Sequence, residues 1–133
     1  MRYAISYVSS AKNNISEKEV EEILDSAEEY NNTGDITGLL LFSEGNFFQV
    51  IEGEEKKVRE LFEDIKNDER HTNIIKLFEK PIHKPAFDGY RSDYVTENTK
   101  FNSAKLRDYH RHVEVLDTKT QQAVENVLRA FIY

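Results

Sequence analysis

Two polar side chains stand inside otherwise apolar stretches of the chain, where they could take part in hydrogen-bond or redox chemistry. Gln49 is a carboxamide within the apolar run Phe47–Ile51, and Tyr7 is a phenol in the short alternating run Tyr3–Val8. Burying an amide without partners costs about 1 to 3 kcal/mol, so Gln49 should hydrogen-bond to another group. Because strand side chains alternate between faces, Tyr7 and Gln49 can touch if both lie on the same face of one sheet.

A third set of polar groups lies at the end of a helical pattern. Asn31 and Asn32 precede Thr33 and Gly34. Asparagine and glycine favour helix ends regardless of function. Taken alone, this segment is better explained as a helix stop than as a binding site.

The periodicity of the chain predicts the elements that position these groups. Ser16 and Glu19 form a capping box, and apolar residues then recur at helical spacing up to Gly34. We expect strands at 3–8, 36–42, 47–53, 74–79 and 90–95, a hairpin turn at 43–46, and helices at 16–33 and around 58–65. The order β-α-β-β-α-β-β is an α+β, ferredoxin-like pattern with one strand added.

The central strand around Gln49 is apolar on both faces, so both faces of the sheet need cover. Two helices between strands cover one face of such a sheet. A last helical pattern near the C-terminus carries Val124, Val127, Leu128 and Phe131 on one side. We therefore expect a domain at 1–96 and a C-terminal helical extension at 97–133 that packs on the second face.

Several of these segments together resemble the BLUF family (blue light using flavin). They are Tyr7-Val8-Ser9, Asn31 placed five residues before ITGLLL, FFQVIEG with its Gln49, and NDERHTN at 67–73. The resemblance implies a photoreceptor that holds FAD or FMN non-covalently, with the flavin ring between the two helices and the sheet. It also implies a sensor and not an enzyme.

The resemblance assigns roles to individual residues. Tyr7 is the expected electron donor, and Gln49 bridges the tyrosine to flavin N5 and O4. Asn31 hydrogen-bonds the C2 and N3 edge of the ring, Asn32 assists nearby, and Ser9 belongs to the cofactor-binding set.

The segment after the second helix and the fifth strand carry further assignments. Arg70 and His71 are expected on the ribityl or phosphate side, where a cation suits an anion, and Asp68 is expected to pair locally. At the fifth strand the family has a tryptophan and, two residues on, a methionine, but this chain has Tyr90 and Ser92. This departure puts signal relay through that strand in doubt.

Composition excludes several classes of chemistry. The chain has no cysteine, so it forms no disulfide, no thiolate site and no cysteinyl-flavin adduct. Its net charge of -7 disfavours nucleic acid as a partner. No stretch is long and apolar enough to span a membrane, and no leader is apparent, so we expect a cytoplasmic protein. His110 and His112 lack a third ligand nearby, and we expect no metal.

At 133 residues the chain is sized for one main domain, so output is expected to pass to an unknown effector protein or through a homo-oligomer. Two alternatives remain open. The same fold could serve as a regulatory module that binds another polar ligand without photochemistry. An acylphosphatase-type enzyme is disfavoured, because the loop at 9–14 lacks the arginine and glycines of a phosphate cradle.

Overall fold

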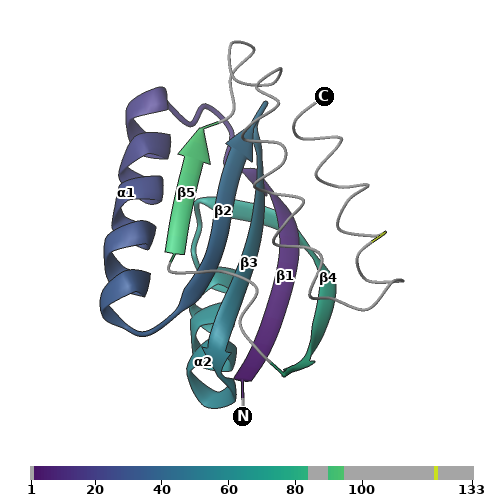
Figure 1. Ribbon diagram of the computed structural model, residues 1–133. Coiled ribbons are helices and arrows are strands. Elements are labelled where there is room, and N and C mark those ends of the chain that lie inside the picture. Colours follow the sequence, from purple (N-terminus) through teal and green to yellow (C-terminus); the bar gives the residue numbers. More distant parts are fainter. Residues whose placement is uncertain (1, 84–89, 95–121, 123–133) are drawn as a thin grey trace.

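A five-stranded sheet with two helices makes up the part of the chain that the computed structural model describes, residues 2–83, 90–94 and 122 (Figure 1). The elements are β1 (Arg2–Ala11), α1 (Glu17–Thr33), β2 (Thr37–Ser43), β3 (Asn46–Glu54), α2 (Glu55–Lys66), β4 (His71–Ile82) and β5 (Tyr90–Tyr94). The strand order is β4-β1-β3-β2-β5. All neighbours are antiparallel except β2 and β5, which run parallel. The predicted ferredoxin-like arrangement with an added strand is confirmed.

The first helix begins and ends where its sequence signals predict. The Ser16 hydroxyl accepts a hydrogen bond of 3.1 Å from the backbone N–H of Glu19. At the other end, the N–H of Gly34 donates to the carbonyls of Tyr30 and Asn31. Both contacts satisfy backbone groups that a helix leaves without intrahelical partners.

The β2–β3 hairpin turns at Glu44 and Gly45, both of which have positive φ, at 50° and 82°. Two positive φ values are typical of the turn whose twist matches that of the flanking strands. The predicted hairpin is therefore confirmed, and its tight turn holds β3 in register with β2.

The fourth strand is longer than its hydrophobic pattern predicts, since it runs from His71 to Ile82. It pairs along the whole of β1, from Arg2 opposite Ile82 to Ala11 opposite His71, with two register shifts. As an edge strand it has no fully buried residue, so no alternation of apolar and polar residues marks its ends. The predicted start of this strand at residue 74 was wrong, because backbone pairing with β1 begins at His71.

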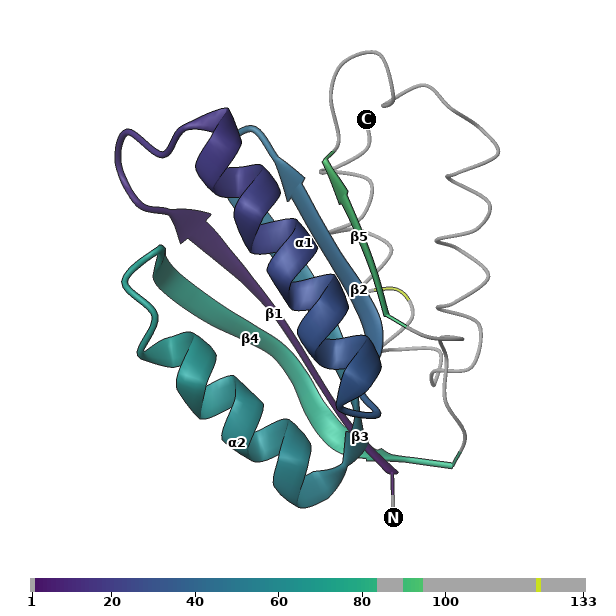
Figure 2. The same cartoon turned by 90° about the vertical axis from the view of Figure 1, so that its left-hand side faces the viewer.

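Both described helices pack on the same face of the sheet (Figure 2). Val20 and Leu24 of α1 and Val58 and Phe62 of α2 belong to one buried cluster with the side chains that β1, β2 and β3 direct to this face. The opposite face is also buried at Leu39, Leu41, Phe48 and Val50. The predicted extension at 97–133 lies outside the described residues, apart from residue 122. Within the described part, neither helix has the length and apolar character needed to cross a bilayer.

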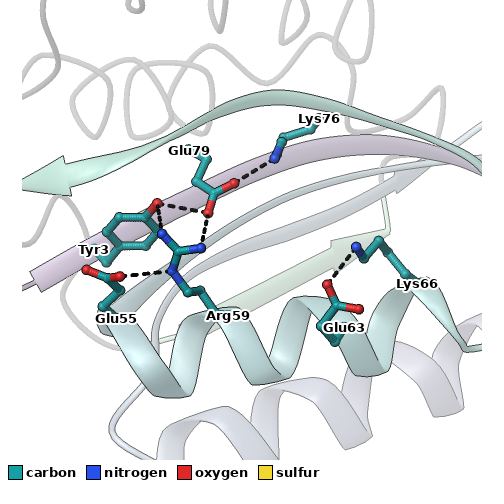
Figure 3. Close-up of polar contacts among 7 residues, drawn as sticks. All are labelled: Tyr3, Glu55, Arg59, Glu63, Lys66, Lys76 and Glu79. Atoms are coloured by element: carbon teal, nitrogen blue, oxygen red, sulfur yellow. Dashed lines mark hydrogen bonds and ion pairs between the residues drawn. The ribbon is translucent and has the colours of Figure 1, made fainter.

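Polar contacts fasten α2 to the edge of the sheet (Figure 3). The Arg59 guanidinium donates to the Tyr3 hydroxyl at 3.0 Å and lies 3.4 Å from the Glu79 carboxylate. The Tyr3 hydroxyl in turn donates to Glu79 at 2.8 Å. Helix α2 and strands β1 and β4 are thereby linked to one another.

Candidate functional site

Tyr7 and Gln49 face each other across the two central strands. They are Cα partners in the β1–β3 ladder, and the Tyr7 hydroxyl donates a hydrogen bond to the Gln49 side-chain oxygen. Their exposed fractions are 0% and 3%. The Ser6 hydroxyl, on the other face, donates to the Gln49 carbonyl at 2.9 Å and ties the two strands together at this point. The predicted contact between the phenol and the amide is therefore present.

Asn31 brings a second buried amide to the same region from the last turn of α1. It is 2% exposed, and within the described residues no group donates a hydrogen bond to its side-chain oxygen. Its backbone carbonyl accepts from the N–H groups of Gly34 and Ile36, which fixes the turn into β2. A buried acceptor without a donor costs about 1 to 3 kcal/mol, which favours a ligand that supplies an N–H.

These three side chains line a cavity of about 340 Å³ between α1, α2 and the sheet. The volume lies in the range of small-molecule sites. The wall is predominantly apolar, with a few polar groups among Ile23, Ala27, Leu40, Leu61 and Ile65. A flat, mostly apolar molecule with a polar edge fits such a lining.

His71 closes one side of the cavity beside Tyr7. Its ring lies 4.6 Å from the Phe47 ring and meets the Tyr7 ring edge-on at 6.2 Å. Its Nδ1 is hydrogen-bonded to the Ser9 hydroxyl at 2.9 Å. Burial lowers the pKa of His71, with a smaller opposing effect from Asp68, so the imidazole is neutral near pH 7.

Asp68 and Arg70 form an ion pair at the mouth of the cavity. The Arg70 guanidinium donates to both carboxylate oxygens of Asp68, the shortest contact being 2.7 Å, and the Arg70 backbone N–H also donates to one of them. These hydrogen bonds lower the pKa of Asp68 and raise that of Arg70. The local pairing predicted for Asp68 is confirmed, and its partner is the arginine expected on the phosphate side.

Of the remaining predicted residues, Asn32 lies outside the cavity wall, and Tyr90 and Ser92 are placed by their backbone pairing. Asn32 is exposed and borders a separate surface hollow with Asp25, Glu28 and Glu29. The backbones of Tyr90 and Ser92 pair with Gly38 and Leu40 in the β2–β5 ladder.

Among the polar residues of the wall, sequence reasoning missed Ser26, Tyr30 and Asp64. Ser26 and Tyr30 flank Ala27 and Asn31 on α1, and Asp64 lies three residues after Leu61 on α2. Helical spacing from a residue already known to face the cavity would have found them.

The arrangement combines an oxidisable phenol, a hydrogen-bonded amide that both donates and accepts, and an adjoining apolar cavity. Loss of an electron from Tyr7 can be coupled to release of its proton toward the Gln49 oxygen. Such a site suits reversible electron and proton movement beside a bound redox-active ring.

The sequence matches a known family model over residues 3–93, described as BLUF, sensors of blue light using FAD. The chain is also similar to the blue light- and temperature-regulated antirepressor BluF of Escherichia coli, with 42% identity over 60 residues that cover 45% of this chain and 15% of that protein. Photoactivated adenylate cyclase subunit beta of Euglena longa is 31% identical over 83 residues, or 62% of this chain and 10% of the cyclase. The match thus spans a small fraction of each relative's length.

Solved structures agree with the family match. The fold is similar to that of the BlrP1 BLUF domain, with a TM-score of 0.76 and 25% identity over 99% of this chain and 90% of that one. It is also similar to a bacterial light-regulated adenylyl cyclase, with a TM-score of 0.70 and 28% identity over 95% of this chain and 36% of the cyclase. The family match, the relatives and the shared fold lead to one conclusion: this chain belongs to the BLUF family of blue-light sensors.

Proposed function

We propose that this chain is a cytoplasmic blue-light photoreceptor that binds a flavin non-covalently in the cavity between α1, α2 and the sheet. The observation that carries the proposal is the buried hydrogen bond from Tyr7 to Gln49 at the cavity wall. It joins a phenol that can be oxidised to an amide that can both donate and accept hydrogen bonds, at the wall of a cavity large enough for a small molecule.

The cavity lining suits a flavin ring. Asn31 has a buried oxygen that lacks a donor within the described residues, and a flavin carries one ring N–H at its polar edge. Asn31 and Gln49 would hold that edge, while Ile23, Leu40 and Ile65 would contact the apolar part of the ring. Since the chain has no cysteine, a cysteinyl adduct is excluded.

Tyr7 and Gln49 would perform the photochemistry. A bound flavin supplies an oxidant when it absorbs blue light. Tyr7 gives up an electron, and its hydroxyl proton moves along the existing hydrogen bond to Gln49. The Gln49 amide has a donor end and an acceptor end, so it can rotate or tautomerise and leave the pair bonded differently after the charge returns. No substrate is consumed, so the chain acts as a sensor and not as an enzyme.

The changed bonding has a physical route toward the edge of the sheet. Gln49 pairs with Leu40 on β2, and Leu40 pairs with Ser92 on β5, so one row of residues crosses the sheet from Tyr7. We propose that Ser92 and Tyr90 take part in relay and that output passes to an effector protein or a second copy of the chain. The relatives support an effector, because one is named as an antirepressor and another as a cyclase subunit.

The test is the visible spectrum of purified protein loaded with FAD or FMN, recorded in the dark and under blue light. We expect a flavin spectrum that shifts reversibly to the red. Tyr7→Phe and Gln49→Leu should still bind flavin but lose the shift, because each removes one partner of the switching hydrogen bond. Tyr3→Phe is the matched control, since Tyr3 is a buried tyrosine on the same strand that does not line the cavity.

The outcomes separate the possible failures. A full shift in Tyr7→Phe or Gln49→Leu would refute the mechanism while leaving flavin binding intact. Bound flavin with no shift in the wild type would indicate an impaired photoreceptor. No flavin binding at all would favour a regulatory module with another polar ligand.

A further inference from the structure

The charged residues around the flavin cavity carry an excess of negative charge. Asp64 and Asp68 line the cavity together with a single cation among the described residues, Arg70, so two carboxylates face one guanidinium. All three lie on or just after α2. A phosphate that leaves the cavity on this side would meet more negative than positive charge.

Arg70 is also poorly placed to bind an added anion. Its guanidinium already donates to both oxygens of Asp68, at distances from 2.7 to 3.2 Å. Its pKa is raised chiefly by the hydrogen bonds to Asp68. Glu19, another carboxylate that acts on Arg70, is itself paired with Lys12 at 2.6 Å. A phosphate would have to displace the forked Asp68–Arg70 ion pair to reach this guanidinium.

A neighbouring cavity has the same excess of negative charge among its described lining residues. A second cavity of about 220 Å³ adjoins the first, and the two share Tyr30, Leu61 and Asp64. Its charged lining is Lys57, Glu60 and Asp64, again two carboxylates and one cation. In both cavities the described lining carries more carboxylates than cations, and Asp64 belongs to both.

We propose that this cavity selects the uncharged flavin nucleus and its ribityl chain, with Asp64 acting as a specificity-determining residue against the phosphate. The inference rests on the proposed function and refines it. Riboflavin binds at least as tightly as FMN, and FAD binds through its flavin half without help from its phosphates. The phosphate of FMN carries about two negative charges at neutral pH, so its repulsion by the carboxylates of the lining weakens as salt is added.

The test is a fluorescence-quenching titration of the full chain, freed of flavin, with riboflavin, FMN and FAD. We expect the dissociation constant of riboflavin to be equal to or lower than that of FMN at about 20 mM salt. Raising the salt to about 500 mM should tighten FMN binding by about threefold and leave riboflavin unchanged, since only FMN feels the screened repulsion.

The decisive variant is Asp64→Asn, which keeps shape and removes one charge from both cavities. FMN should bind about fivefold more tightly than to the wild type, as expected for about two charges at surface distances, while riboflavin binding stays the same. Glu21→Gln is the matched control, because Glu21 is an exposed acid on α1 that lines neither cavity. It makes the same change in net charge and should leave both affinities unaltered.

Each outcome decides the matter. FMN or FAD binding more than tenfold tighter than riboflavin, or FMN binding that weakens with salt, would overturn the inference while supporting a flavin site. An equal effect of Asp64→Asn and Glu21→Gln would show that only overall charge matters, which also overturns it. Failure of all three flavins to bind would overturn the proposed function and this inference with it.

Discussion

Replacing Asn31 with leucine should have opposite effects on the stability of the flavin-free protein and on its affinity for flavin. In the flavin-free protein, the buried Asn31 oxygen has no donor among the described residues. Leucine has a similar branched shape, removes this polar atom and favours the helix more than asparagine does. The free energy of unfolding should rise by about 1 kcal/mol, toward the lower end of the usual cost of an orphaned polar group.

That gain corresponds to an increase in Tm of about 3 to 5 °C for a domain of this size. Flavin binding should weaken, because the polar edge of the ring loses its partner in a buried site. A loss of about 1 to 3 kcal/mol corresponds to a dissociation constant raised by about 5- to 150-fold.

Circular dichroism melting of the flavin-free protein and a flavin fluorescence titration measure the two effects separately. Asn32→Leu is the control, since Asn32 is the next residue of α1 but is exposed and outside the cavity wall. It should leave flavin affinity unchanged. A lower Tm for flavin-free Asn31→Leu, or an unchanged flavin affinity, would contradict the role assigned to Asn31.

Two further predictions concern pH and the backbone. The pKa of His71 is lowered from its ordinary value of 6.5 by burial, so the unfolded chain binds the proton more readily. Stability should therefore be full above about pH 6.5 and decline as the pH falls toward the folded-state pKa. In thermal melts from pH 8 to 5, His71→Phe should reduce this loss of stability at low pH, whereas His83→Gln, at an exposed histidine, should not. If stability falls as steeply with pH in His71→Phe as in the wild type, this histidine is not the cause. Gly38 has φ of 148°, and a Cβ there would collide with the Val50 carbonyl, so Gly38→Ala should lower stability in urea by at least about 2 kcal/mol. Gly45 has open space around its Cα, so Gly45→Ala should cost only about 1 kcal/mol, and equal losses would contradict the steric argument.

Local patterns in the sequence were sufficient for most of the fold. The capping box at Ser16, the stop at Gly34 and the turn at Glu44-Gly45 act within a few residues, so their effects can be predicted without knowing the rest of the chain. The alternation of side chains along β1 and β3 correctly predicted which residues of each strand point to which face of the sheet. The length of edge strand β4 was underestimated, because none of its residues is fully buried and its sequence therefore lacks a strong alternation of apolar and polar residues.

The sequence alone also determined which residue types could do the chemistry. It named a phenol and an amide in apolar surroundings, and the motifs around them resembled one family of flavin-binding sensors. It could not show that Tyr7 and Gln49 are direct partners, because the register between β1 and β3 is set by long-range packing and not by local spacing.

The tertiary structure showed that Asn31 lines the cavity whereas Asn32 does not, and it placed Asp64 at the wall. Successive helical residues point about 100° apart, so of two adjacent asparagines one lines the cavity and the other lies on the surface. Asp64 reads as an ordinary exposed acid of an amphipathic helix until α1 packs beside α2 and the two cavities form around it. Helix orientation and the meeting of distant segments depend on the packing of the whole core, and for that reason the charge at the cavity mouth could be known only from the folded chain.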